Sequence, residues 1–258
     1  MRENKAVPRG LRKGTRTFSL SNGMDPQFLI LGVMWYIVFL FSTVCHEGAH
    51  SLAAHLGGDS TAFQQGQASL NPLPHIRRAP FGTVLVPILS YVMPPHWMIG
   101  WASAPYDPAW QRRYPRRAAW MALAGPAANF TLVVCAGVAI RAGTALGVFR
   151  VPEYAGFSHV TQAANPGAAG AAATLLSLLF VMNVLLGTFN LLPLPPLDGH
   201  TAITLLMPPD RAVRYLDWAR DLQLGMAGAV LAWVVYAKVF GTIFRLFLAA
   251  LYPGSHWG

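Results

Sequence analysis

The sequence predicts an all-α integral membrane protein with a single domain and five to six transmembrane segments. Two observations lead to this fold class. Hydrophobic residues make up 54% of the 258 residues and charged residues only 11%, whereas soluble domains carry about 25% charged residues. The charged residues also lie mostly in the gaps between long apolar runs, and a helix of roughly 20 apolar residues crosses a bilayer. A chain so poor in charge cannot cover a soluble surface, so we expect lipid to be its solvent.

The apolar runs predict the individual segments. Residues 27–56 read as one long helix, because about 30 residues rising ~1.5 Å each extend beyond the thickness of the bilayer core. Residues 118–140 and 169–192 predict further spans, and residues 222–251 supply the last one or two. Residues 83–101 are apolar but carry three prolines, which predicts a broken or kinked span.

The segments between these runs are more polar. Residues 1–25 are basic and contain glycines without an apolar stripe, which predicts a flexible tail ahead of one domain over residues 26–258. Residues 59–82 are too polar to span, and we expect short strands or a re-entrant loop beside the first helix. Residues 141–168 predict a loose loop, and the mixed charge of residues 198–221 predicts an amphipathic interfacial helix.

The charge balance fits a membrane surface better than a nucleic acid. Lys and Arg number 19 and Asp and Glu 10, for a formal net charge of +9. No basic helix face and no nucleic-acid motif accompany this charge, and the basic residues flank the apolar runs, as anionic headgroups favour. We therefore expect a lipid bilayer and no nucleic-acid partner. The two cysteines, Cys45 and Cys135, lie inside apolar runs and indicate no disulfide framework.

The sharpest chemical signal is His46-Glu47-Gly48-Ala49-His50, near the end of the first apolar run. On a helix, residues four apart face the same way, so both imidazoles can bind one metal ion while Glu47 acts as a general base on a water. The pattern also occurs by chance, and the alternative is a hydrogen-bonded cluster that only ties helices together. Ionisable groups at membrane depth are costly, which favours the functional interpretation.

A catalytic zinc ion takes three protein ligands and keeps one position open, so a third ligand is expected elsewhere. Asp198 fits best, because it follows an apolar run in the segment Asn190-Leu-Leu-Pro-Leu-Pro-Pro-Leu-Asp198-Gly199. The three prolines forbid a regular helix there, and unwound backbone at membrane depth has to line a cavity or be buried in protein. We expect this segment to face the same pocket as the histidines. The alternative is that Asp198 only caps the next helix.

A third feature is Gly125-Pro126-Ala127-Ala128-Asn129, inside a predicted span. Small residues let helix backbones approach closely, and an asparagine in lipid needs a polar partner. This pattern therefore indicates either helix packing alone or a polar partner for Asn129 at membrane depth.

In chain order, three motifs resemble those of the site-2 protease family of intramembrane zinc metalloproteases. They are HEGAH at 46–50, GPAAN at 125–129 and NLLPLPPLDG at 190–199. The family's motifs are HExxH, a Gly-and-Asn element in the middle core helix, and Asn-x-x-Pro followed closely by Leu-Asp-Gly. The resemblance covers residues 27–210 and is to the compact members without PDZ or CBS domains. It implies a core of three transmembrane helices around the zinc.

The resemblance also implies roles for individual residues. The two histidines of HEGAH and Asp198 would hold one Zn²⁺ per chain, and Glu47 would be the catalytic base and acid. Asn129 and Asn190 would bind the substrate backbone or help to stabilise the oxyanion, which needs donors placed near the developing charge. The metal ligands would thus be His46, His50 and Asp198.

The activity implied is hydrolysis of peptide bonds within or near transmembrane segments of membrane proteins. The partners would be a substrate with a transmembrane helix and the bilayer, in a multi-pass setting that the high Ala, Gly and Arg usage suggests is a prokaryotic cell membrane. A metal transporter or channel is an alternative, but it should show several ligand clusters along a path and the sequence shows one. A catalytically silent homologue is another, although every expected catalytic residue is present. The substrate, the orientation in the membrane and the oligomeric state stay open.

Two further histidines have two interpretations each. His200 directly follows Leu-Asp-Gly, where the family more often has a small residue. It can orient Asp198 through a hydrogen bond or lie at the membrane interface. His55 points about 140° away from the face of His50, as expected of a histidine at a helix end or at the interface.

Overall fold

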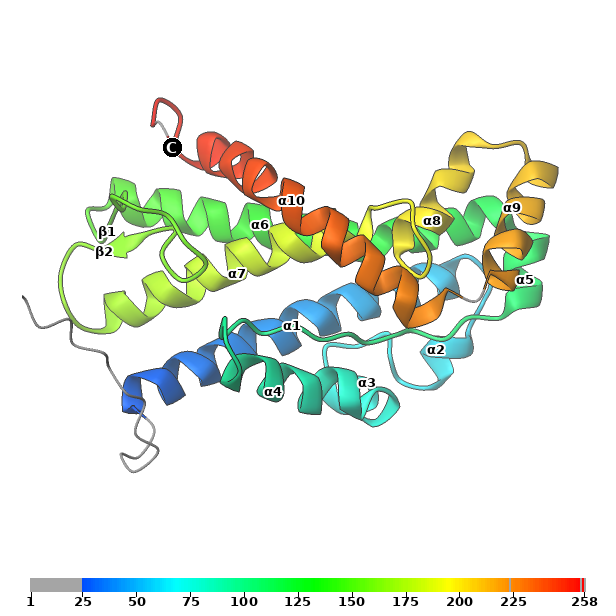
Figure 1. The fold of residues 1–258 in the computed structure, drawn as a ribbon, viewed down its shortest axis with the longest axis horizontal. Helices are drawn as coiled ribbons and strands as arrows, with labels where there is room; N and C mark the ends of the chain where they lie inside the picture. Colours follow the sequence, from blue (N-terminus) through cyan, green and yellow to red (C-terminus); the bar gives the residue numbers. More distant parts are fainter. Residues whose placement is uncertain (1–24, 223, 256, 258) are drawn as a thin grey trace, which may run out of the picture.

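Four long helices dominate the fold of the computed structural model, which describes residues 25–222, 224–255 and 257. They are α1 (Pro26–Leu56), α6 (Pro115–Ala145), α7 (Ala168–Asn190) and α10 (Gly225–Leu251). The first three run along the length of the molecule, and α10 crosses them obliquely (Figure 1). By length and composition all four can cross a membrane, which confirms the all-α membrane class. The predicted flexible tail, apart from Asp25, lies outside the described residues.

Within the described residues such helices number four, against the five to six segments that the apolar runs predict. The difference lies at residues 83–101, where a π-helical turn (Phe81–Leu85) leads into α4 (Val86–Val92) and the chain then continues without helix to residue 107. This apolar helix is too short to cross a bilayer, because Pro94 and Pro95 cannot continue it. Residues 222–251 supply one helix rather than two.

Residues 59–82 form short helices and no strand. These are α2 (Thr61–Gln64) and α3 (Pro72–Arg78), joined by an irregular stretch. The start of α3 is encoded locally: Pro72 occupies the first turn, and the side chain of Asn71 accepts the N–H of Leu73 at 3.0 Å. In the described residues the strands lie elsewhere, in the loop predicted over residues 141–168. There β1 (Phe149–Arg150) pairs antiparallel with β2 (Gln162–Ala163).

The prediction of a single interfacial helix over residues 198–221 is wrong. The chain forms α8 (Asp198–Ala202), a 3-10 turn (Ile203–Leu206) and α9 (Pro209–Asp221). The physical reason is the Pro208-Pro209 pair, since a residue before proline avoids the helical region and proline begins a new helix readily. Helix α9 is amphipathic, with Ala212, Leu216 and Ala219 buried.

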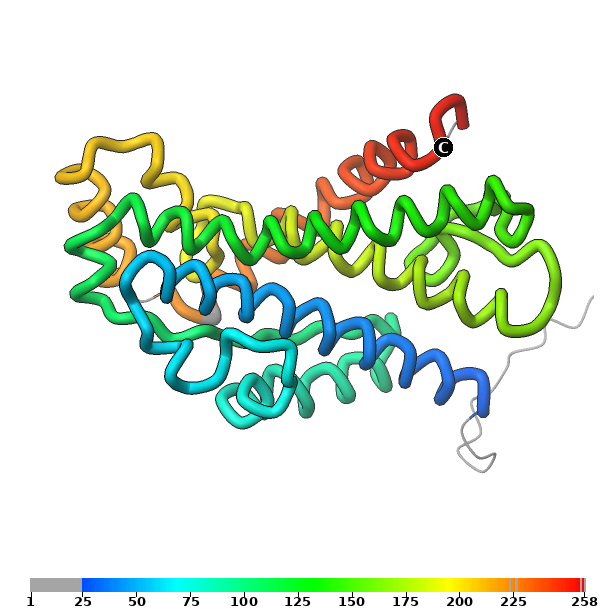
Figure 2. Tube along the Cα trace, turned by 180° about the vertical axis from the view of Figure 1, so that it is seen from behind, coloured from blue at the N-terminus to red at the C-terminus, as the bar shows by residue number. Residues whose placement is uncertain are grey.

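The core of the bundle is made by α1, α6 and α7, with α6 packed along both of the others (Figure 2). Between α1, α4 and α7 the buried contacts come from large side chains, among them Phe39, Tyr91 and Leu178. Between α6, α7 and α10 they include Ile140 and Leu248. The three-helix core that the family resemblance implies is therefore present, and α10 lies against it from outside.

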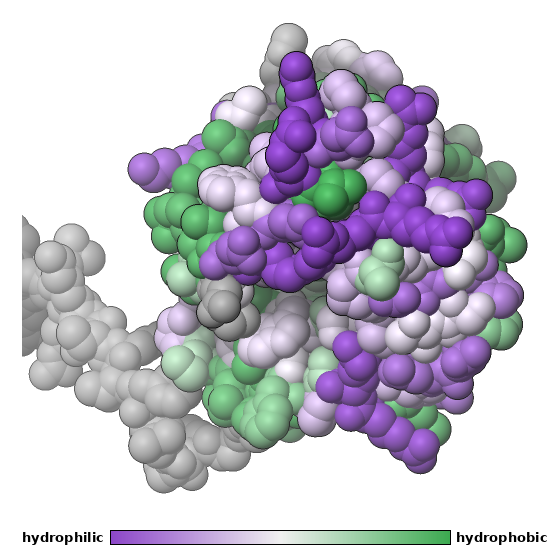
Figure 3. Space-filling model, turned by 90° about the vertical axis from the view of Figure 1, so that its right-hand side faces the viewer, coloured by the Kyte–Doolittle hydropathy of each residue, from purple (hydrophilic) through white to green (hydrophobic). Residues whose placement is uncertain are grey.

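One end of the molecule is hydrophilic (Figure 3). It carries α9 and α5 (Pro108–Arg113), which are joined by an ion pair between Arg112 Nη2 and Asp217 Oδ2 at 3.0 Å. Arginines on α5, on the first turn of α6 and on α9 are exposed there: Arg112, Arg113, Arg116, Arg117, Arg211, Arg214 and Arg220. A basic end beside an apolar bundle suits contact with anionic lipid headgroups.

At the same end, the side chain of Asp59 links the start of α2 to the segment before α5. Its Oδ1 accepts from the backbone N–H of Thr61 at 2.9 Å and from the Thr61 hydroxyl, and its Oδ2 accepts from the backbone N–H of Asp107 at 2.7 Å. Burial opposes the charge of Asp59, but these three donors outweigh it and hold the pKa of the carboxyl below its usual range.

Asp59→Asn is expected to lower thermal stability most at neutral pH. An amide can offer only one acceptor to these donors, so the loss should be about 1.5–3 kcal/mol. A carboxyl whose pKa is lowered by folding stabilises the protein above its unfolded pKa and loses that contribution as the pH falls. The difference in melting temperature between wild type and variant in detergent should therefore shrink on acidification from about pH 7 to about pH 3.5. Asp221→Asn, at an exposed carboxylate, is the control. A difference that is constant with pH would contradict this account.

Candidate metal centre

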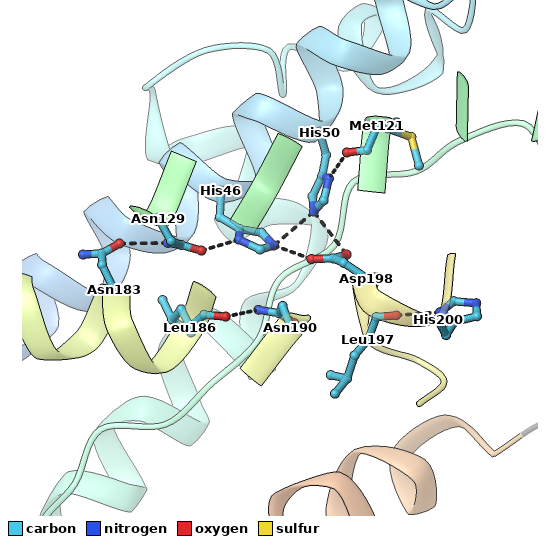
Figure 4. A network of polar contacts seen from close by, with 10 residues as sticks. All are labelled: His46, His50, Met121, Asn129, Asn183, Leu186, Asn190, Leu197, Asp198 and His200. Atoms are coloured by element: carbon cyan, nitrogen blue, oxygen red, sulfur yellow. Dashed lines mark hydrogen bonds and ion pairs between the residues drawn. The ribbon is translucent and has the colours of Figure 1, made fainter. Parts of the chain in front are cut away.

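Three predicted side chains converge on one point between α1 and α8 (Figure 4). The Nε2 atoms of His46 and His50 lie 3.0 Å apart. His46 Nε2 lies 3.0 Å from Asp198 Oδ2, and His50 Nε2 lies 3.2 Å from Asp198 Oδ1. Both histidines are buried, and Asp198 is partly buried. The helical spacing of HEGAH and the proline-rich segment thus bring together the residues that the sequence singled out.

The irregular segment between α7 and α8 brings Asp198 to the histidines of α1. Helix α7 ends at Asn190, and Asp198 begins α8. At Gly199 the backbone lies so close to the carbonyl oxygens of Leu191 and Leu192 that a Cβ would collide with both. A glycine at this position therefore lets α8 fold back on the end of α7, which directs Asp198 at the histidines.

Helix α6 forms the wall of the site at Gly125. A Cβ built on Gly125 would lie 2.6 Å from His46 Nε2, and it would also collide with the ring of His50. Only a residue without a side chain fits at this position of the GPAAN motif. Glycine therefore allows the α6 backbone to pass directly beside the two imidazoles.

The other ring nitrogen of each histidine is held by an oxygen from α6. His50 Nδ1 lies 2.8 Å from the backbone oxygen of Met121, and His46 Nδ1 lies 2.6 Å from Asn129 Oδ1. These oxygens can only accept, so both Nδ1 atoms carry a hydrogen and donate it. In a neutral imidazole the lone pair then sits on Nε2, which faces the cluster. This arrangement is typical of metal-binding histidines.

The cluster is chemically incomplete without a cation. With neutral rings, two Nε2 lone pairs and a carboxylate face one another at 3.0–3.2 Å, and acceptors so placed repel. Asp198 Oδ2 is buried, and within the described residues it accepts no hydrogen bond. Zinc bonds of about 2.0–2.2 Å in a tetrahedron would place ligand atoms roughly 3.3 Å apart. The three residues therefore fit a zinc ion with one position left for another ligand.

Glu47 lies in the same turn of α1 as His46 and is only 7% exposed. Its carboxylate makes no hydrogen bond or ion pair with any residue that the structure describes. A buried carboxylate that bonds to none of the described residues is available to accept a proton from a bound water.

Comparison with known proteins places the chain in a family. The model of Peptidase family M50 matches residues 34–214, a range that contains all three ligand candidates and Glu47. The chain belongs to peptidase family M50. The protein named "Putative zinc metalloprotease YwhC" from Bacillus subtilis (strain 168) is 31% identical over 182 residues, which are 69% of this chain and 72% of that protein. These two matches confirm the family resemblance, and they support a metalloprotease. No solved structure matches the chain.

The two asparagines have different surroundings in this M50 peptidase. Asn129 is fully buried, and its amide bonds to His46 and to Asn183. These contacts hold the ring of His46, and a role of Asn129 toward substrate or oxyanion stays a prediction. Asn190 donates from Nδ2 to the backbone oxygen of Leu186 at 3.0 Å and is partly exposed. Its Oδ1 has no partner among the described residues, so a contact with substrate stays a prediction for Asn190.

The remaining histidines of the M50 peptidase do not join the cluster. His200 Nδ1 donates to the backbone oxygen of Leu197 at 2.5 Å, and no bond links this ring to Asp198. The structure therefore does not support an orienting role of His200. His55 bonds to Ser60 Oγ at 2.8 Å and stacks on Phe63 with ring centroids 3.9 Å apart, which is consistent with a histidine at a helix end.

Sequence reasoning missed two contributors to the site. The backbone oxygen of Met121 holds His50, and Asn183 on α7 holds Asn129. No sequence signal marks a backbone carbonyl. Asn183, however, is an amide in the middle of a mostly apolar run, and such a residue at membrane depth needs a polar partner.

Proposed function

We propose that this M50 peptidase is a zinc-dependent endopeptidase that hydrolyses peptide bonds within or near transmembrane segments of other membrane proteins. One observation carries the proposal. The His46–His50–Asp198 cluster lies with Glu47 inside a bundle of helices that are long and apolar enough to span a bilayer. A hydrolytic centre at that depth can reach peptide bonds that soluble proteases cannot.

The metal ligands in this proposal are His46, His50 and Asp198, with one Zn²⁺ per chain. When bound, zinc would polarise the scissile carbonyl and lower the pKa of a water. Met121 and Asn129 keep the two imidazoles turned with Nε2 toward the cluster. Gly125 keeps the space beside them free of side chains.

Glu47 moves the protons. One oxygen of its carboxylate takes a proton from the attacking water, whose oxygen forms the new bond to the carbonyl carbon. The same carboxyl then gives that proton to the nitrogen of the leaving amine as the C–N bond breaks. Glu47 suits this exchange because it is buried and bonded to no described residue.

The substrate class follows from the location. A transmembrane helix hides its carbonyls in intrahelical hydrogen bonds, so it has to unwind locally before it can be cut. Asn190 Oδ1 can then accept a hydrogen bond from a freed backbone N–H of the substrate. The proposed partner is a membrane protein whose transmembrane helix unwinds readily, in a prokaryotic cell membrane.

Glu47→Gln is expected to abolish proteolysis while the protein still binds zinc. Loss of a general acid–base usually costs about 10²–10⁴-fold in rate, and the amide keeps the shape of the side chain. The assay uses purified protein in lipid vesicles and a labelled substrate helix with a central Gly-Pro pair, which weakens the helix. Glu153→Gln, an exposed glutamate between α6 and α7, is the matched control. Cleavage by Glu47→Gln at the rate of this control would exclude Glu47 as the base.

A further inference from the structure

A chain of buried amides connects His46 to α7 (Figure 4). Asn129 Nδ2 donates to Asn183 Oδ1 at 2.8 Å, and Asn183 Nδ2 donates to the backbone oxygen of Leu179 at 2.8 Å and to Ser42 Oγ at 2.9 Å. Asn129, Asn183 and Ser42 are all 0% exposed. The chain therefore joins α1, α6 and α7 without access to water, and it ends on one of the predicted metal ligands.

The direction of every bond in this chain follows from its far end. The backbone oxygen of Leu179 can only accept, so the Asn183 atom beside it has to be Nδ2. Asn183 Oδ1 then faces Asn129, which has to donate from its own Nδ2. That leaves Asn129 Oδ1 toward the ring of His46, whose Nδ1 has to carry the hydrogen. Each reversal would set two acceptors or two donors against each other in a buried site.

We infer that Asn183 is a positioning residue, which acts through Asn129 to hold His46 in the ring orientation and tautomer that a metal ion requires. The inference rests on the proposed metal centre and extends it by two side chains. Asn183 touches neither metal nor substrate. It fixes which end of the Asn129 amide faces His46, and thereby which nitrogen of His46 keeps a free lone pair.

Removal of Asn183 is expected to release the Asn129 amide. Without an acceptor on α7, Asn129 can turn over and present its NH₂ group to His46 Nδ1. That nitrogen would then accept rather than donate, and the ring hydrogen would move to Nε2, where it blocks the metal. Loss of a partner that orients a histidine ligand typically weakens metal binding by 10–100-fold.

Ser42 provides a built-in control. It accepts the second N–H of Asn183, but the bond to the Leu179 oxygen alone determines the direction of the chain. Ser42→Ala therefore removes a buried hydrogen bond from the same cluster without freeing Asn129. Asn183→Asp is a second control, because a protonated carboxyl there accepts from Asn129 and donates to Leu179 in the same way.

The experiment measures zinc affinity by competition with a chelator, and the visible absorption of the cobalt-substituted protein, in detergent. Asn183→Leu is expected to bind zinc about 10–100-fold more weakly and to change the cobalt spectrum. Ser42→Ala and Asn183→Asp are expected to stay within about threefold of wild type and to keep its spectrum. Asn183→Thr keeps a hydroxyl that can donate to Leu179, but its oxygen lies one bond closer to the backbone than Asn183 Oδ1 and falls short of Asn129. This variant should behave like Asn183→Leu and fold readily.

Three results would overturn the inference. They are an unchanged zinc affinity and spectrum in both Asn183→Leu and Asn183→Thr, an equal loss in Ser42→Ala, or a loss in Asn183→Asp as large as in Asn183→Leu. The last two would mean that packing of the cluster matters and not the direction of its hydrogen bonds. Failure of the wild type itself to bind zinc would instead overturn the proposed metal centre.

Discussion

Gly125→Ala is expected to weaken zinc binding strongly in a protein that remains folded. The new methyl group would lie 2.6 Å from His46 Nε2 and would also collide with His50. The rings cannot retreat without losing the bonds to Asn129 and Met121 that orient them. Zinc affinity should fall by roughly 100-fold or more, at the upper end of the effect of disturbing a ligand's supporting contacts.

The control for this variant lies in the same helix. A Cβ at Gly137 would be 3.6 Å from Leu251 Cδ1, which is an ordinary contact. Both substitutions should stabilise α6 itself, because alanine is about 1 kcal/mol more favourable than glycine inside a helix. Gly137→Ala should therefore bind zinc and cleave substrate as wild type does. Equal zinc affinity of the two variants would show that α6 does not form the wall of the metal centre.

Asp198→Asn is expected to have the larger effect, the loss of both zinc and proteolysis. The amide removes the negative charge and places an NH₂ group beside the histidines. From that position it can donate to an Nε2 atom and satisfy the cluster without a metal. Asparagine preserves the volume of the side chain, so the helices around it should pack as before.

The measurement is zinc affinity by chelator competition together with cleavage of the substrate helix. Asp210→Asn, an exposed carboxylate in the first turn of α9, should leave both unchanged. If Asp198→Asn bound zinc as tightly as wild type, Asp198 would be a helix-capping residue and the third ligand would have to come from elsewhere.

The ligand set is predictable from sequence because its determinants are local. Two histidines one helical turn apart need only a helix, and α1 runs through both. The prolines before Asp198 end α7 by simple steric exclusion, so a polar segment follows an apolar span at a defined point. Only the meeting of these two segments in space depends on the tertiary structure.

The contacts that orient the two histidines depend on the tertiary structure. Whether Met121 or Asn183 faces the histidines depends on how α6 and α7 slide and rotate against α1, and no short sequence pattern encodes that. The same limit affects the membrane segments. Prolines at 94 and 95 signal an interruption after α4, but the path of the following residues depends on what packs around them. The Pro208-Pro209 pair, by contrast, is a local signal for the break before α9.

The zinc content of the purified wild-type protein, measured beside Asp198→Asn and Glu47→Gln, decides whether the metal centre exists. We expect about one zinc per chain in wild type and in Glu47→Gln, as a site with three protein ligands should hold, and little or none in Asp198→Asn. Wild type without bound metal after zinc loading, or Asp198→Asn with the same content as wild type, would contradict the proposed metal centre.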